Sequence, residues 1–307
     1  MDKNTGPAKT EDNLNFFKRL YYNTKGCLAL IYISLNTIIL FTPVFILSLI
    51  KLIRYRPMQT ICTKLIIIIA TRWVNNNTFL FKNLLGVKIN VKGDFDLRMN
   101  NWYFVISNHQ SWSDIIILQM VFNGKIPLLK FFIKQELIWV PLLGIAWWAL
   151  DFPFMKRYSP EFIKKNPHLK GKDIEITKKA CEKFNLTPVS VMNFVEGTRF
   201  TEQKHKRQNS PYKNLLNPKA GGVGFVFTAM GSIINSIVNV TIKYPEKNIG
   251  FWHFLSGRIR KVDFLIESIN MTDDLIGDYM EDPEYQARFK KWINDLWEEK
   301  DKVFDSM

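Results

Sequence analysis

The chain has 307 residues, and its 42 Lys and Arg against 28 Asp and Glu give a formal net charge of +14. This length is ample for a buried core, and the charge favours anionic partners such as nucleic acid, acidic lipid headgroups or phosphate-bearing cofactors. The three cysteines, Cys27, Cys62 and Cys181, form no Cys-x-x-Cys pair and have no His cluster nearby. This pattern excludes a disulfide framework and a zinc site.

Residues 1–24 form a polar leader, and Cys27 to Ile50 then run for 24 residues without a charge. A helix of that length can cross a bilayer core of roughly 30 Å. We do not expect a secretory signal peptide, because its apolar core is typically about 7–15 residues and the leader here contains Glu11 and Asp12. A buried core helix is the alternative interpretation of the same run.

A second predicted helix, from Met58 to Leu85, contains another apolar stretch, so residues 25–86 are expected to form membrane-associated helices. Basic residues flank both ends of the first helix, and the positive-inside rule therefore does not choose an orientation. Two arrangements stay open, a single span and a hairpin that dips into one leaflet.

Residues 87–270 are predicted to form an α/β domain. Strands are expected at 87–92, 102–106, 126–133, 149–154, 189–195 and 236–244, helices at 111–122 and 174–184, and loops at 157–172 and 201–218. Strands that alternate with helices predict a largely parallel twisted sheet covered by helices. Such sheets bind ligands at the carboxyl ends of their strands.

The basic excess is concentrated between Lys156 and Lys219, where 15 Lys and Arg face 6 Asp and Glu. Residues 271–307 carry 5 basic and 11 acidic residues, and we expect them to form an acidic C-terminal helix. An anionic ligand is therefore expected near the basic stretch. Lysine-rich loops that serve only as soluble surface are the alternative.

The string Asn108-His109-Gln110-Ser111-Trp112-Ser113-Asp114 follows the strand predicted at 102–106. A neutral histidine can accept the proton of an attacking hydroxyl, and Asp114 can fold back to hydrogen-bond the other ring nitrogen. His168 and Asp173 have the same spacing, but they lie in a Pro- and Lys-rich loop that no strand presents. No Gly-x-Ser-x-Gly string occurs, which argues against a covalent serine mechanism.

Asp114 also has a structural interpretation, because Ser111-x-x-Asp114 approximates a helix capping box. A cap and a catalytic dyad can coexist at this position.

The string Phe194-Val195-Glu196-Gly197-Thr198-Arg199 follows the strand at 189–195. Arginine is the side chain best shaped to grip a phosphate through two parallel hydrogen bonds, and the turn would project into the same crevice as His109. A surface salt bridge between Glu196 and Arg199 is the alternative. Together the two strings predict acyl transfer onto a phosphorylated acceptor.

These strings resemble the signature of the glycerophospholipid acyltransferase family typified by lysophosphatidic acid acyltransferase (PlsC-type), which pairs Asn-His-x4-Asp with Phe-x-Glu-Gly-Thr-Arg. Further strings extend the resemblance over about residues 87–245: Lys134-Gln135-Glu136-Leu137, Phe154-Met155-Lys156-Arg157, Pro218-Lys219-Ala220-Gly221-Gly222 and Val240-Thr241-Ile242-Lys243-Tyr244.

The resemblance implies a membrane-docked α/β domain behind an N-terminal helical pair. It implies that His109 is the base and Asp114 its partner, with Asn108 supporting the motif. The acceptor phosphate would be held by Glu196, Gly197, Thr198, Arg199, Lys134, Lys156 and Arg157.

The resemblance further implies that acyl-CoA or acyl carrier protein is the donor co-substrate and lysophosphatidic acid the acceptor, with no metal and no other cofactor. The partner is then a phospholipid membrane, expected to be a bacterial inner membrane with the active site facing the cytoplasm. Asp151 and Asn239 stand where many members have Gly and Pro, which favours the YihG-like bacterial branch and leaves another lysophospholipid acceptor open.

Two other classes compete with this interpretation. A basic nucleic-acid-binding protein has only the charge in its favour, because the chain lacks a recognisable binding signature and its uncharged run would serve such a protein poorly. We therefore expect no nucleic-acid partner. A non-catalytic membrane scaffold would be marked by a mutated dyad, and both His109 and Asp114 are present.

Overall fold

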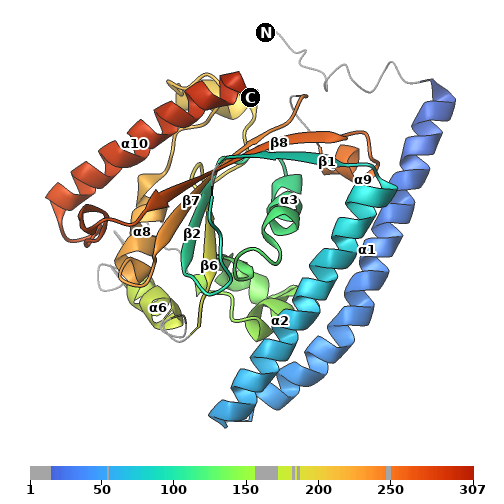
Figure 1. Ribbon diagram of the computed structural model, residues 1–307, viewed down its shortest axis with the longest axis horizontal. Coiled ribbons are helices and arrows are strands. Elements are labelled where there is room, and N and C mark those ends of the chain that lie inside the picture. Colours follow the sequence, from blue (N-terminus) through green and yellow to red (C-terminus); the bar gives the residue numbers. More distant parts are fainter. Residues whose placement is uncertain are drawn as a thin grey trace.

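A six-stranded sheet forms the centre of the computed structural model, which describes residues 15–53, 55–93, 95–155, 172–181, 184, 187–246 and 250–307 (Figure 1). The strand order is β1-β8-β7-β2-β6-β3, and all neighbours are parallel except β7 and β8. The strands are β1 (Lys88–Lys92), β2 (Tyr103–Ser107), β3 (Leu129–Phe131), β6 (Ser190–Phe194), β7 (Ser236–Lys243) and β8 (Lys261–Asn270). A separate pair joins β4 (Ile133–Lys134) to β5 (Phe154–Met155).

Both faces of the sheet are buried under helices. Along β2, Tyr103 and Val105 belong to one core cluster and Phe104 and Ile106 to the other, as the two-residue period of a strand requires. One face packs against α3 (Ser113–Phe122), α9 (Phe251–Leu255) and the π-helical turn Leu80–Leu84. The other packs against α6 (Lys172–Cys181), α8 (Ala220–Met230) and α10 (Pro283–Ser306). The predicted fold class, a largely parallel sheet covered by helices, is confirmed.

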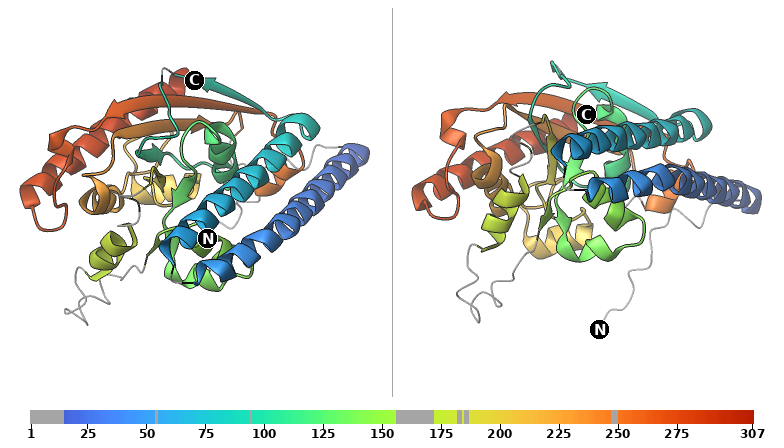
Figure 2. Two further views of the ribbon diagram at one scale, coloured as in Figure 1. Left: turned by 60° about the horizontal axis from the view of Figure 1, so that its bottom comes forward. Right: turned by 90° about the horizontal axis from the view of Figure 1, so that it is seen from below.

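The N-terminal helices α1 (Phe16–Lys51) and α2 (Arg56–Phe79) lie side by side along one edge of the molecule (Figures 1 and 2). Polar contacts set their antiparallel register: Asn36 donates to Oδ1 of Asn77 at 3.1 Å, and Trp73 donates to Oγ1 of Thr37 at 3.0 Å. The two helices therefore pair as an antiparallel hairpin. The choice between a single span and a hairpin in one leaflet stays a prediction.

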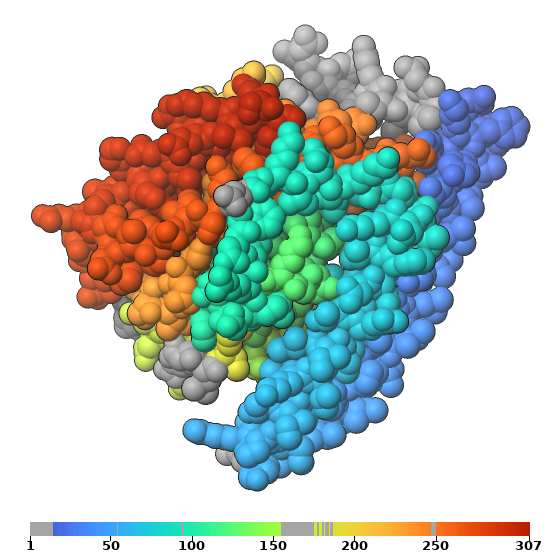
Figure 3. All heavy atoms as spheres, in the orientation of Figure 1, coloured from blue at the N-terminus to red at the C-terminus, as the bar shows by residue number. Residues whose placement is uncertain are grey.

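Within the described part of the chain, α1 is the one helix long and apolar enough to cross a membrane, with a mean hydropathy of 2.2 over 18 residues. Only 17% of that window is buried inside the protein. An apolar helix with so little internal burial does not fit a buried core helix. The space-filling view shows this helical pair along one side and α10 on the opposite side (Figure 3).

Several local predictions differ from the structure. The strand predicted at 149–154 is wrong over most of its length, because α4 (Leu143–Ala149) ends there and Asp151 turns the chain at a φ of 59° before the short β5. The loop predicted at 201–218 contains α7 (Glu202–Gln208), whose first turn is capped by the Thr201 side chain accepting from the Lys204 amide at 3.2 Å. β8 was not predicted at all.

Candidate active site

The His109 imidazole and the Asp114 carboxylate form a buried hydrogen-bonded pair just beyond the carboxyl end of β2. Nδ1 of His109 lies 2.8 Å from Oδ2 of Asp114, and the side chain of Asp114 is fully buried. The same oxygen accepts the backbone amides of Gln110 at 2.7 Å and Ser111 at 2.9 Å. Asp114 therefore caps its helix and contacts the histidine at once, and three donors stabilise one carboxylate oxygen.

Two neighbouring side chains hold the histidine loop in place. The Asn108 side chain donates to the Ile242 carbonyl and accepts the Ile242 amide, each at 2.9 Å, which fastens the loop to β7. The Phe194 ring stacks on His109 with centroids 3.8 Å apart and planes within 12°. With Nδ1 directed at Asp114 and the ring plane set by Phe194, Nε2 of His109 is the nitrogen left for a substrate proton.

Tyr244 is a site residue to which the sequence analysis assigned no role. Its hydroxyl donates to Oδ1 of Asp114 at 2.6 Å, so the carboxylate is bound at both oxygens. Burial, together with the charge of Asp114, raises the pKa of the Tyr244 hydroxyl well above 10 and keeps it a neutral donor. β7 lies beside β2 with Val240 opposite Ser107, which brings the end of β7 to the dyad.

The second motif turns sharply next to the histidine because β6 and β2 are parallel neighbours. The Gly197 amide donates to the Phe194 carbonyl at 2.9 Å, and Gly197 has a φ of 66°. A Cβ on Gly197 would lie 2.9 Å from Cδ of Lys219, so both the backbone conformation and the space favour glycine. The turn is tied to the first motif where the Phe200 amide donates to the His109 carbonyl at 2.7 Å.

Arg199 and His109 line the same cavity, of about 380 Å³. The Arg199 guanidinium carbon lies 4.5 Å from the centroid of the Trp112 ring, a stacking contact that restrains its orientation. Gly197 and Thr198 also line this cavity. Lys204, which was not singled out from the sequence, donates to Oγ1 of Thr198 at 2.7 Å and to the Arg199 carbonyl at 3.0 Å.

Glu196 does not belong to this cavity lining. Its side chain is fully buried, with Oε1 accepting the Leu216 amide at 3.4 Å. Burial raises the pKa of Glu196 well above its usual value. The predicted phosphate contact through Glu196 stays a prediction, and the burial of its carboxyl favours a supporting role inside the fold.

The other predicted phosphate ligands lie apart from this turn or outside the described residues. Lys134 is exposed on β4 and does not line the cavity. Lys156 and Arg157 lie outside the described residues. Among the residues that the structure describes, no group of three or more His, Cys, Asp or Glu side chains could hold a metal ion.

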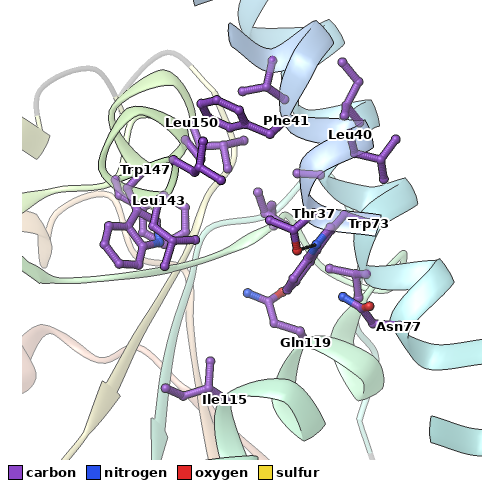
Figure 4. Close-up of a pocket in the computed structure, with 18 of the residues that line it drawn as sticks. Thr37, Leu40, Phe41, Trp73, Asn77, Ile115, Gln119, Leu143, Trp147 and Leu150 are labelled. Atoms are coloured by element: carbon purple, nitrogen blue, oxygen red, sulfur yellow. Dashed lines mark hydrogen bonds between the residues drawn. The ribbon is translucent and has the colours of Figure 1, made fainter. Parts of the chain in front are cut away.

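A second cavity, of about 290 Å³ and almost wholly apolar, lies between the helical pair and the α/β body (Figure 4). Leu40 and Phe41 of α1, Trp73 of α2, Ile115 and Gln119 of α3, and Leu143, Trp147 and Leu150 of the α4 region face into it (Figure 4). Phe131 lines both this cavity and the one that contains His109. An apolar chain can therefore be accommodated next to the His-Asp pair.

Comparison with known proteins identifies the class. A model of the Acyltransferase family matches residues 88–242, about half of the chain, so the chain belongs to the Acyltransferase family. The matched region contains both motifs and the Ile242 backbone that binds Asn108.

Curated relatives carry a more specific name. The chain is 27% identical over 242 residues to the 1-acyl-sn-glycerol-3-phosphate acyltransferase epsilon of Mus musculus, covering 73% of this chain and 63% of that protein. It is 29% identical over 133 residues to the alpha protein of Homo sapiens, covering 43% of this chain and 41% of that protein. The chain thus spans less than two thirds of the length of these relatives.

The fold is shared with a solved structure, the 1-acyl-sn-glycerophosphate (LPA) acyltransferase PlsC from Thermotoga maritima. The superposition covers 93% of this chain and 98% of that chain with a TM-score of 0.50, at 17% sequence identity. This likeness supports the arrangement of the sheet and helices.

Proposed function

We propose that this protein is a membrane-associated acyltransferase that moves a fatty acyl group from a thioester donor to the free hydroxyl of lysophosphatidic acid. The observation that carries the proposal is one cavity lined by both His109 and Arg199, with an apolar cavity beside it. The names of the curated relatives support the acceptor.

In the proposed reaction, Nε2 of His109 takes the proton of the acceptor hydroxyl as its oxygen attacks the thioester carbonyl carbon. Asp114, hydrogen-bonded to Nδ1 of His109, stabilises the imidazolium that results. Collapse of the tetrahedral intermediate breaks the carbon–sulfur bond. The departing thiolate then takes the proton from the imidazolium, which restores neutral histidine and releases a thiol and the ester.

Arg199 is the proposed phosphate ligand. Its guanidinium is restrained on the Trp112 ring and lines the cavity of His109, so a phosphate bound there carries its hydroxyl toward the base. Holding two reactants in this way can contribute about 7–11 kcal/mol to catalysis. Gly197 and Thr198 line the same wall and offer backbone and hydroxyl donors.

The acyl chain of the donor is proposed to occupy the apolar cavity between the helical pair and α3, with acyl-CoA or acyl carrier protein as the thioester. The apolar surface of α1 supports membrane association, as do the lipid substrates named for the relatives. A bacterial inner membrane, and a site that faces the cytoplasm, stay predictions.

Transfer of a labelled acyl group from acyl-CoA to lysophosphatidic acid, measured with purified protein in mixed micelles, tests the proposal. His109→Ala should abolish transfer while His253→Ala, on α9, leaves it intact. Folding of both variants is checked by far-ultraviolet circular dichroism. Activity retained in His109→Ala would remove the dyad mechanism.

The acceptor is tested with a panel of lysophospholipids that differ only in the headgroup on the phosphate. Preference for lysophosphatidic acid is the expected result. Preference for a headgroup-bearing acceptor would keep the acyltransferase and overturn the substrate assignment.

A further inference from the structure

A cluster of apolar side chains from η2 (Gln135–Trp139), α4 and the residues that join them is exposed on the surface. Its most exposed member is Trp139, at 86% of its full accessible area. The cluster, called the Trp139 surface below, consists of Leu137, Trp139, Leu142, Leu143, Ile145 and Trp148, each more than a third exposed. Leu142 and Leu143 also line the apolar cavity, so the cluster reaches from the cavity to the outside. A contiguous group of large apolar side chains is unusual on a soluble surface and marks an interaction site.

This surface is continuous with the membrane-seeking helices. Ala149 and Leu150 of the α4 region pack in one apolar cluster with Val44 of α1 and Ile66 of α2. Nζ of Lys51, the last residue of α1, donates to the Ala149 carbonyl at 2.8 Å and to Oδ2 of Asp151 at 2.7 Å. Figure 2 shows α4 beside the end of the pair where α1 passes into α2. The segment that carries the Trp139 surface therefore packs directly against α1, the helix long and apolar enough to cross a membrane.

α4 uses its two sides differently. Trp147 and Leu150 face the apolar cavity (Figure 4), whereas Ile145 and Trp148 are more than a third exposed. The segment thus separates the apolar cavity from the outside, and both of its sides are apolar.

The composition of the segment points to a bilayer as the occupant. Tryptophan is enriched at the boundary between hydrocarbon and headgroups, where its apolar ring is buried and its N–H meets water or headgroup oxygen. The charged neighbours Lys134 and Glu136 are both exposed and cancel each other. This surface would therefore bind a bilayer through its apolar side chains and not through attraction to charged headgroups.

The geometry points to the Trp139 surface as a second membrane-contact site, which enters the interfacial zone of the bilayer beside α1 and next to the apolar cavity. This inference rests on the proposed function for its lipid substrates. The contact itself requires only that the protein is membrane-associated. It would bring the wall of the apolar cavity into direct contact with lipid.

Site-specific labelling tests the contact with the full chain reconstituted in phosphatidylcholine–phosphatidylglycerol vesicles. Cys27, the exposed native cysteine, is replaced by Ser, and a bimane label is attached to Trp139→Cys or to the control Met280→Cys. Met280 is also an exposed apolar residue, but it lies just before α10, on the side of the sheet away from the helical pair.

The label at position 139 should be quenched by brominated lipids severalfold more than the label at 280, and it should be protected from aqueous iodide. Equal lipid quenching at the two positions would overturn the proposal. So would protection from iodide without lipid quenching, since that result assigns the surface to a second copy or another protein.

A charge at the surface should matter only when the acceptor lies in a bilayer. Trp139→Glu should lower acyl transfer roughly tenfold on vesicles, the cost of withdrawing one large apolar side chain, and leave transfer in mixed micelles unchanged. Met280→Glu should leave both unchanged. If Trp139→Glu lowers acyl transfer equally on vesicles and in mixed micelles, Trp139 is needed for the fold and not for membrane contact, which contradicts the proposal. If the wild type transfers no acyl group, the proposed function fails, and the quenching comparison still decides the membrane contact.

Discussion

Tyr244 donates its hydroxyl proton to Oδ1 of Asp114 at 2.6 Å, although 130 residues separate the two in the chain. The other oxygen of Asp114 meets His109. Both oxygens of the carboxylate are therefore held in place, one by His109 and the other by the neutral hydroxyl of Tyr244. Tyr244 acts on the histidine through Asp114, which makes it a positioning residue.

Tyr244→Phe should lower kcat roughly tenfold and leave the KM for the acceptor unchanged, because a hydrogen bond to a charged group is worth about 1.5–3 kcal/mol and part of it orients the base. Tyr212→Phe is the control, since its hydroxyl donates to a backbone carbonyl of α10 at 3.5 Å. Full kcat in Tyr244→Phe contradicts the role.

Arg199→Lys should raise the KM for the phosphorylated acceptor roughly tenfold or more, because lysine lacks the planar fork that binds two phosphate oxygens and stacks on Trp112. Initial rates at varied acceptor concentration measure the effect. Arg207→Ala, an exposed arginine on α7, is the control. An unaltered KM in Arg199→Lys would assign the phosphate to another cation.

Substitutions of Glu196 distinguish two roles for its carboxyl, stabilising the fold and binding the acceptor phosphate. Glu196→Gln keeps the shape and the hydrogen-bond acceptor at a buried position, so the KM for the acceptor should not change. Glu196→Ala should lower kcat and the unfolding free energy, since the buried amide of Leu216 loses its acceptor, a cost of about 1–3 kcal/mol. Steady-state kinetics and urea denaturation of both variants provide the comparison. A KM raised alone, without loss of stability, would restore Glu196 as a phosphate ligand.

Lys300 of α10 is fully buried, with Nζ donating to the Val240 carbonyl at 2.6 Å, and burial lowers its pKa from 10.5 to about 7. Between these two values the unfolded chain holds a proton that the folded chain lacks, so the unfolding free energy should rise with pH across this window. Lys300→Met should flatten that rise. Denaturation of the detergent-solubilised protein at several pH values in the window measures it.

Lys302→Met is the matched control for Lys300, because Lys302 lies two residues further on the same helix and is 70% exposed. It should keep the pH dependence of the wild type. The same slope in Lys300→Met would show that Lys300 is not the group responsible.

The contact between His109 and Asp114 and the parallel sheet were predictable because short-range patterns encode them. A continuous apolar run marked β2, and a second strand was predicted at 189–195. The residues directly after these two parallel strands belong at the same sheet edge. The antiparallel β8 was missed because its burial departs from strict alternation, with Val262, Asp263 and Phe264 all buried in succession. The false strand at 149–154 arose because an apolar run of that length fits a helix end as well as a strand.

The direction of individual side chains could not be predicted. Glu196 and Arg199 are three residues apart in one tight turn, yet the first points into the core and the second lines the cavity. Tyr244 meets Asp114 only because β7 lies next to β2, a neighbour relationship that no local pattern encodes. The resemblance to known acyltransferases supplied the residue set, and the fold divides it into residues that line the cavity and residues buried beneath it.

The apolar cavity has walls from both the helical pair and the α/β body. A shortened chain that started at β1 would retain His109, Asp114 and Arg199. It would lack α1 and α2, and the apolar cavity would be open to solvent on the side that these helices cover. Removal of α1 and α2 to make the protein soluble would thus remove one wall of the cavity proposed to hold the acyl chain. The proposed membrane anchor and the proposed acyl-chain site share residues of these two helices.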